Sequence, residues 1–217
     1  KSWNDRLAST IRANHGEAAG KVLEKKYNNA FSPSYSEANL PSAALVDIEK
    51  LERLDEKRTL DMLFYRPQEE GPDSQAVKLK LFHRNEPIHL SAVLPMLENF
   101  GLRVIDESPF RIQCSEGEVN WIMDFSMLHN NGEKMDMEKA QILFQNAFAK
   151  VWHNLLEDDP FNRLVLGAGL TGRNVTILRA YAKYMRQTGS SFSISYMANT
   201  LANYPNIAKL LIELFSQ

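Results

Sequence analysis

The chain has 217 residues, of which 44% are hydrophobic and 24% are charged, and its formal net charge is −2. This composition is typical of a globular protein with one large or two small domains. No apolar run approaches the length that spans a bilayer, and the single cysteine, Cys114, excludes an internal disulfide framework. We therefore expect a cytoplasmic protein with no membrane partner.

Charge is distributed unevenly along the chain. Residues 160–217 hold six Lys or Arg and one acid, Glu213, and therefore carry +5, which leaves −7 for residues 1–159. Such an asymmetry indicates two parts with different surroundings. The sequence begins with Lys1 rather than Met, and an apolar helical pattern runs to its last residues. We expect a fragment of a longer polypeptide.

Residues 1–56 are predicted to form an N-terminal helical segment. Ser2 suits an N-cap, and apolar residues such as Leu7 and Ile11 recur at helical spacing. Gly16 is expected to end this first helix or to bend it. Pro41 suits the first turn of a later helix.

The middle of the chain changes to a period of two. The segments "TLDMLFYRP" and "AVKLKLFHR" flank the polar turn "QEEGPDSQ" and predict a hairpin. A helix follows in "HLSAVLPMLENFG", then two strands in "LRVIDESPFRIQC" and "VNWIMDFSML", then a helix from Met135 with Phe144 and Phe148 on one face. The order β-β-α-β-β-α predicts an α+β fold with a permuted, ferredoxin-like, four-stranded antiparallel sheet. Helices are expected on one face of this sheet, and residues 59–66 at an edge.

The predicted boundaries give an N-terminal helical segment at 1–56, a ferredoxin-fold domain at 57–157 and a C-terminal helical segment at 158–217. In the last segment an acid of "EDDP" is expected to cap the next helix. Later helices show two apolar faces, one formed by Val175, Leu178, Ala182 and Met185 and the other by Ile207, Leu210, Leu211 and Leu214.

The stretch "RLVLGAGLTGRN" contains the glycine spacing of a dinucleotide-binding turn, at Gly167, Gly169 and Gly172. A true fingerprint follows a buried strand and is followed, about 20 residues later, by an acid for the ribose. No Asp or Glu occurs between residues 160 and 212, and the preceding apolar run is short. We therefore predict a helix, a glycine-rich turn and a second helix capped by Thr171, with no bound cofactor.

The stretches "PIHLSAVLPMLENFGLRVIDESPF", "EDDPFNRLVLGAGL", "ILRAYAKYMRQTG" and "SWNDRL" together resemble the large bacterial NAD-specific glutamate dehydrogenases, in the same order along almost the whole chain. In that family, a long N-terminal region with amino-acid-sensing ACT domains and helical segments precedes the catalytic domain. The resemblance implies that this chain is part of that region, and that NAD and the catalytic lysine and aspartate belong to the parent enzyme's later domain. No position here matches those residues, so no catalytic, cofactor or metal residue is assigned.

The resemblance also implies an effector site. ACT domains bind small amino acids at the turn between the first strand and its helix, here "HRNEPIHLS". Arg84, Asn85, Glu86 and His89 are the candidates for holding a zwitterion. The glycine that many ACT domains place there is absent. A working sensor and a sheet used only for domain association both stay open.

A second candidate surface is basic. Arg179, Lys183 and Arg186 fall at i, i+4 and i+7 and share a helix face. We expect a contact with an acidic neighbouring domain or subunit.

These features lead to one main hypothesis, a regulatory and assembly segment of an NAD-dependent glutamate dehydrogenase. Its partners would be other domains and subunits of a homo-oligomer. The alternative is a free-standing nucleotide- or nucleic-acid-binding module that uses the glycine turn 167–172 and the basic helix 173–186. A third possibility is an interaction domain with an edge strand at 59–66 open to a neighbour.

Overall fold

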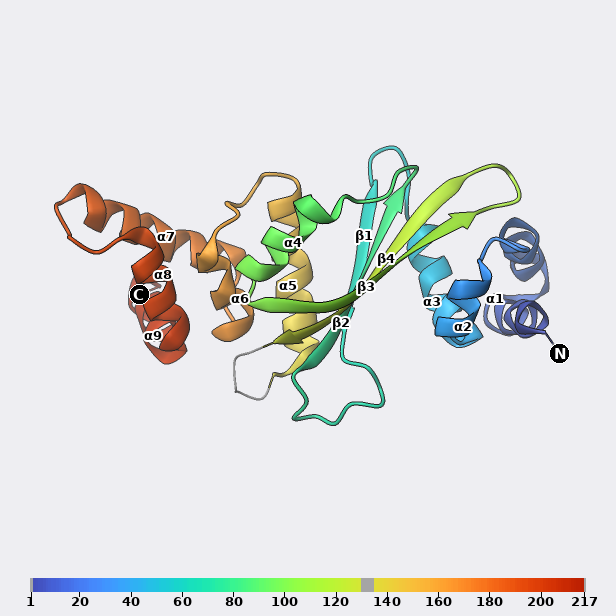
Figure 1. The fold of residues 1–217 in the computed structure, drawn as a ribbon, viewed down its shortest axis with the longest axis horizontal. Coiled ribbons are helices and arrows are strands. Elements are labelled where there is room, and N and C mark those ends of the chain that lie inside the picture. The colour runs from blue at the N-terminus through green and yellow to red at the C-terminus, as the bar shows by residue number, and fades with distance from the viewer. Residues whose placement is uncertain (1, 130–134, 217) are drawn as a thin grey trace. The chain divides into compact units, whose positions relative to one another are not determined.

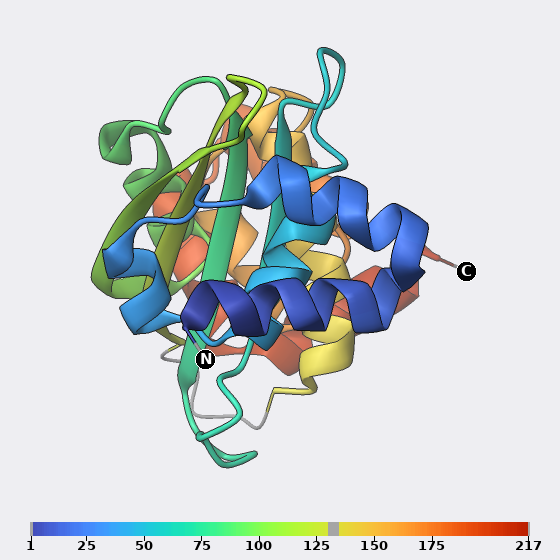
Figure 2. The ribbon, with the colours of Figure 1, turned by 90° about the vertical axis from the view of Figure 1, so that its right-hand side faces the viewer.

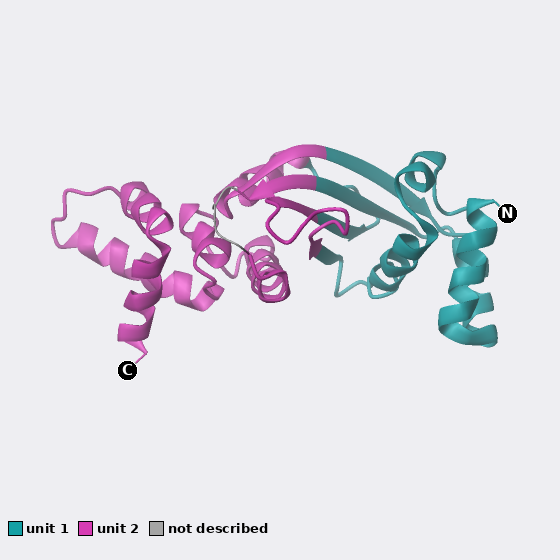
Figure 3. Ribbon diagram, turned by 90° about the horizontal axis from the view of Figure 1, so that it is seen from below, with its two compact units in different colours: residues 1–63, 79–89, 107–125 teal, residues 64–78, 90–106, 126–217 magenta. Residues whose placement is uncertain are grey.

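The computed structural model describes residues 2–129 and 135–216 (Figure 1). The chain divides into two compact units, residues 1–63, 79–89 and 107–125 in unit 1 and residues 64–78, 90–106 and 126–217 in unit 2 (Figure 3). The helices and strands, in chain order, are α1 (Trp3–Tyr27), α2 (Pro33–Ala38), α3 (Pro41–Leu51), β1 (Leu60–Tyr65), β2 (Ala76–Arg84), α4 (Leu90–Asn99), β3 (Leu102–Gln113), β4 (Val119–His129), α5 (Met137–Trp152), the 3-10 turn η1 (Pro160–Asn162), α6 (Arg163–Gly167), α7 (Gly172–Gln187), α8 (Ile194–Asn203) and α9 (Pro205–Phe215).

Within the described residues, the strands form one four-stranded sheet in the order β1-β2-β4-β3. Asn85 N donates to Val119 O, and His129 N donates to Gln75 O, so β2 and β4 run antiparallel. β1 lies at the edge beside β2, in the position that the last strand of an unpermuted ferredoxin-like sheet would take. The prediction of an α+β fold with this sheet and flanking helices is confirmed.

Helix α1 consists of two arms that fold back on each other (Figure 2). Ser2 caps the first arm in a reciprocal box with Asp5. The arms meet at Gly16, whose φ of 76° and ψ of 175° lie outside the helical region and suit glycine. They come so close that a Cβ on Gly20 would lie 3.0 Å from Arg12 Cα. The predicted bend at Gly16 is therefore confirmed.

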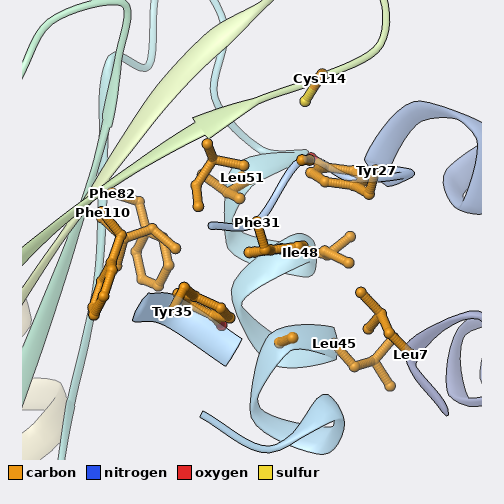
Figure 4. Close-up of a cluster of buried hydrophobic side chains, with 14 of the residues drawn as sticks. Leu7, Tyr27, Phe31, Tyr35, Leu45, Ile48, Leu51, Phe82, Phe110 and Cys114 are labelled. Atoms are coloured by element: carbon orange, nitrogen blue, oxygen red, sulfur yellow. The ribbon is translucent and has the colours of Figure 1, made fainter. Parts of the chain in front are cut away.

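The core of unit 1 joins the N-terminal helices to the sheet (Figure 4). Phe82 of β2 and Phe110 of β3 lie in one cluster with Tyr35 of α2 and with Ile48 and Leu51 of α3. The Tyr35 and Phe110 rings meet edge to face at 5.2 Å, a favourable geometry for aromatic pairs. Each such side chain contributes about 1.5–3 kcal/mol when fully buried. The alternation in β2 thus buries Phe82 as well as Leu79 and Leu81, so apolar contacts cover both faces of this strand.

The core of unit 2 contains a cluster of phenylalanines. Phe64 of β1 and Phe144 of α5 have ring centroids 4.5 Å apart, and Phe100 and Phe148 complete the group at 5.1 Å and 5.4 Å from Phe144. All four side chains are buried. The helix face that the sequence predicts from Phe144 and Phe148 is therefore the one that packs.

Part of the β1 edge is occupied by side chains of α5. Gln145 Oε1 accepts from Phe64 N at 2.9 Å, and Gln141 Nε2 donates to Phe64 O at 2.9 Å. Asp61 Oδ1 accepts from Met62 N at 2.7 Å. These backbone groups are not free to pair with a further strand, and side chains that occupy an edge protect it against such pairing.

Replacing Gln145 with alanine leaves the Phe64 N–H without its acceptor and is expected to lower the free energy of unfolding by about 1–2 kcal/mol. The double variant Gln141→Ala/Gln145→Ala is also expected to self-associate in a concentration-dependent way, because it frees both edge groups. Urea unfolding and light scattering measure the two effects. Gln68→Ala, in an exposed loop, is the control. If Gln68→Ala unfolds and associates like the variants of Gln141 and Gln145, the role of Gln141 and Gln145 at the β1 edge is contradicted.

The C-terminal helices α7, α8 and α9 contact one another. Val175, Leu178 and Ala182 of α7 are buried as the sequence predicts, but Met185 is 47% exposed. On α9 the buried residues are Ala208 and Ile212, whereas Ile207, Leu210 and Leu214 of the predicted apolar face are 49–63% exposed. The helix therefore uses its less obvious apolar face for packing within the chain. No helix in the described ranges has the length and apolar character to cross a membrane.

Candidate functional site

The glycine-rich stretch forms a turn between two helices. Gly167 ends α6, Gly169 has a φ of 63°, and Gly172 begins α7. Thr171 caps α7 by accepting from Asn174 N at 3.2 Å, and Asp159 Oδ1 accepts from Phe161 N at 3.0 Å at the start of η1. The predicted helix–turn–helix and both caps are confirmed. Because a helix precedes the glycines, the strand-to-helix geometry of a dinucleotide-binding turn is not formed.

The turn after β2, the predicted effector site, has a defined backbone. Asn85 adopts a left-handed conformation with a φ of 67°, and Glu86 N donates to Arg84 O at 2.8 Å. His83 Nδ1 lies 2.7 Å from Glu86 O. The side chains of Asn85, Glu86 and His89 are exposed and Arg84 is half-buried. The structure thus brings Arg84, Asn85 and Glu86 into one tight turn, with His89 just before α4.

Arg84 has an unused donor and acidic neighbours. Its Nε is buried and has no hydrogen-bond partner among the described atoms. Its positive charge also helps to lower the pKa of Glu118. Burial alone would raise the pKa of Glu118, but hydrogen bonds from Asn120 and Lys26 outweigh that effect. A guanidinium with a spare N–H is the group that recognises a carboxylate.

Lys26 connects α1 to two acids in unit 1. Its Nζ lies 2.6 Å from Glu52 Oε1 and 3.0 Å from Glu118 Oε2, and Tyr27 Oη donates to Glu52 Oε1 at 2.7 Å. Burial would lower the pKa of Lys26, yet the two carboxylates raise it. Burial raises the pKa of the nearby Cys114 thiol to about 11, so this thiol is protonated at neutral pH and is not an activated nucleophile.

The predicted basic face on α7 has partners within its own unit. Arg179 is 1% exposed and forms a two-pronged pair with Asp159, at 2.6 Å and 2.9 Å, while donating to Asn162 Oδ1 at 2.9 Å. Lys183 Nζ lies 2.7 Å from Glu157 Oε2. Arg186 donates to Ser190 O at 2.9 Å. Two of the three charges are thus neutralised by the "EDD" acids, and a contact of this face with another domain stays a prediction.

A buried polar cluster that the sequence analysis missed lies between α2, α3 and β2. Lys80 Nζ is 2.7 Å from Asp47 Oδ2 and 3.1 Å from Asn39 Oδ1, and Tyr35 Oη also donates to Asp47 Oδ2. Lys80 and Asp47 are 3% and 1% exposed. Burial raises the pKa of Asp47, and Lys80 and Tyr35 oppose this rise. The sequence did contain a signal for this cluster, because Asp47 stands next to the apolar helix positions 44, 48 and 51. An acid on a buried helix face requires a buried partner.

A groove in unit 1 lies between the arms of α1. Its volume is about 440 Å³, and Asn4, Arg12, Lys21, Glu24 and Asn29 are among the residues that line it. Its charges are mixed, because Arg12 Nε and Glu24 Oε2 are 3.6 Å apart. Among the described residues, no group of three or more His, Cys, Asp or Glu side chains is arranged to hold a metal ion.

The imidazole of His129, at the end of β4, has a lowered pKa. Burial lowers its pKa to about 4, below the ordinary value near 6.5. Between these two pH values the unfolded chain binds a proton that the folded chain does not, so the free energy of unfolding falls as the pH falls.

Replacing His129 with leucine is expected to leave stability at pH 7.5 nearly unchanged and to remove an acid-dependent loss on the order of 3 kcal/mol. Urea midpoints of both proteins between about pH 7.5 and about pH 4 measure the difference, and carboxylates common to both proteins cancel. Parallel pH profiles would show that His129 is not the group responsible.

Family models match this chain in three successive parts. A model described as glutamate dehydrogenase, helical motif 2, matches residues 10–54. The glutamate dehydrogenase ACT3 domain model matches residues 59–140, which contain the whole sheet. The model of glutamate dehydrogenase helical motif 3 matches residues 156–217.

Curated relatives match along nearly the whole chain. The NAD-specific glutamate dehydrogenases of Halomonas elongata and Pseudomonas aeruginosa are each 39% identical over 215 residues, and that of Mycobacterium tuberculosis is 32% identical over 220. Each alignment covers 99% of this chain and 13% of the relative. The chain belongs to the family of NAD-specific glutamate dehydrogenases, within which it corresponds to the ACT3 domain and the helical motifs 2 and 3 that flank it.

Proposed function

We propose that this chain is a regulatory and assembly segment of an NAD-dependent glutamate dehydrogenase. The parent enzyme would oxidise L-glutamate with NAD⁺ and water to 2-oxoglutarate, ammonium and NADH, in the cytoplasm, and the catalytic groups would lie elsewhere in its polypeptide. The observation that carries the proposal is that an ACT domain and two helical motifs account for residues 10–54, 59–140 and 156–217. These matches also support the organisation into segments 1–56, 57–157 and 158–217.

Assembly is the first part of this function. The segment would hold domains and subunits of a homo-oligomer in place through its helical parts. Gln141 and Gln145 already bond to the backbone N–H and C=O of Phe64 on the β1 edge. Their bonds therefore support association through helices rather than through addition of a strand at Phe64. No described contact favours the nucleic-acid alternative, since Arg179 and Lys183 are paired with acids of their own unit.

Regulation is the second part. The turn at Arg84, Asn85 and Glu86, with His89 beside it, would bind a free amino acid. The guanidinium of the half-buried Arg84 suits the α-carboxylate, and the exposed Glu86 carboxylate suits the α-ammonium group. Binding at the junction of β2 and α4 would bias the packing of the sheet and so change the activity of the parent enzyme.

Thermal melting of the full-length dehydrogenase with a panel of free amino acids tests the effector site. A ligand of the native state raises the melting midpoint, and one amino acid at millimolar concentration is expected to do so. Arg84→Gln is expected to abolish that shift, whereas Arg103→Gln, on the exposed surface of β3, keeps it. If no amino acid moves the midpoint, the segment serves assembly alone.

A further inference from the structure

The surface of α7, α8 and α9 carries a concentration of exposed apolar side chains. Tyr184 and Leu210 are 62% exposed, Leu214 63%, Tyr204 58% and Tyr196 55%. Apolar residues scattered singly on a surface are ordinary, but a group of them on neighbouring elements marks an interaction surface. These three helices lie together at the C-terminal end of the chain (Figure 1).

Helix α9 shows most clearly that a partner is required. Ala208 and Ile212 pack within unit 2, while Ile207, Leu210 and Leu214, at i, i+3 and i+7, form a second apolar face that is exposed. A helix that is apolar on both faces is normally buried on both. One face of α9 therefore lacks a partner among the described residues.

Charge restricts the nature of the partner. Residues 160–212 contain no acid, and Glu213 is the single acid from 160 to 217. Arg179 and Lys183 are neutralised by Asp159 and Glu157, which leaves Arg163, Arg173, Arg186 and Lys209 as the other cations of this segment, with Lys209 on α9 itself. A second copy of the same surface would bring like charges together, and such juxtaposition is unfavourable. The complementary surface is apolar at its centre and acidic at its rim.

The source of that surface is the remaining polypeptide of the same enzyme. The chain spans 13% of the length of its relatives, so most of such a polypeptide lies outside residues 1–217. A covalently connected surface also has a high effective concentration. We propose that the face of α9 formed by Ile207, Leu210 and Leu214 docks onto an acidic-rimmed apolar surface of the dehydrogenase polypeptide outside residues 1–217. This rests on the proposed membership of the segment in a working dehydrogenase.

Zero-length carbodiimide cross-linking of the full-length enzyme tests the partner's identity. Lys209 is expected to link to an Asp or Glu outside residues 1–217. Links from Lys209 to acids of residues 1–159 in another copy, or links to Glu213 alone, would overturn the proposal.

Hydroxyl-radical footprinting of the same full-length enzyme tests whether the face is covered. Tyr204 and Phe215, which stand at the two ends of α9, are expected to be protected, and Leu210→Asp is expected to raise their modification several-fold. Ile142→Asp is the matched control, because Ile142 is a 59% exposed apolar residue on α5, and it should leave the modification unchanged. Rapid modification of these aromatics in the unsubstituted enzyme would overturn the docking.

The two proposals can fail separately. Loss of the amino-acid-dependent melting shift concerns the turn at Arg84 and leaves the footprint of α9 intact. A missing footprint with a retained melting shift would overturn the docking surface and leave the regulatory role standing.

Discussion

Replacing Lys80 with methionine is expected to lower the free energy of unfolding by about 3–5 kcal/mol, because it leaves a buried carboxylate without its counter-charge. Asp47 is 1% exposed, and its Oδ2 is 2.7 Å from Lys80 Nζ. Urea unfolding followed by the fluorescence of Trp3 measures the loss. Trp3 reports on this region because its Nε1 donates to Asn39 O at 2.8 Å.

The pH dependence identifies the cause of that loss. Without Lys80, burial raises the pKa of Asp47 further in the folded chain, so the folded state binds a proton that the unfolded state releases. The deficit of Lys80→Met is therefore expected to grow as the pH rises from about 5 to about 8.

Two variants serve as controls for the pair. Asp47→Asn removes the stranded charge, so the double variant Lys80→Met/Asp47→Asn should be more stable than Lys80→Met alone at neutral pH. Lys57→Met, at an exposed position, should change stability by less than about 0.5 kcal/mol. A deficit independent of pH would mean that lost packing, rather than the unpaired charge, dominates.

The second large effect is expected at Arg179. Arg179→Met should cost about 3 kcal/mol, because Asp159 and Asn162 lose their buried donor. Arg179→Lys should still cost about 2 kcal/mol, since an ammonium cannot reproduce the two-pronged contact with Asp159. Thermal melting followed by far-UV circular dichroism measures both losses.

Arg186 is the matched control for Arg179, since it lies two turns further along the same helix and is exposed. Arg186→Met should stay within about 0.5 kcal/mol of the unsubstituted chain. Equal, small losses at both positions would contradict the structural role of Arg179 and would favour a basic face that acts only outside the chain.

The fold was largely predictable from local patterns. The period of two in "AVKLKLFHR" and the turn signals around it define the hairpin, and connectivity alone places β1 beside β2. Caps at Ser2, Asp159 and Thr171 were also readable, because capping depends on residues within one turn of each other.

Features that depend on distant residues were not predictable. The partner of Lys80 lies 33 positions away, and the acceptor for Phe64 N lies 81 positions away. The basic pattern at Arg179, Lys183 and Arg186 suggested a shared surface, yet burial separates Arg179 from the other two. The apolar pattern of α9 identified a face without revealing that Ile207, Leu210 and Leu214 are exposed among the described residues. A single sequence shows the periodicity of apolar residues, but it does not show which apolar face of a helix packs against another element.

The bend at Gly16 has a consequence for motion. Each arm of α1 has only a few turns, and isolated helices of that length are marginal in water. Trp3, Lys26 and Tyr27 hold the two ends of α1 through bonds to Asn39, Glu52 and Glu118, whereas residues 16–19 at the bend are exposed. Its backbone amides should exchange with solvent deuterium sooner than those of α3, which buries six of its eleven residues. We expect local opening at the exposed bend of α1 while the ends of the helix and the sheet stay folded.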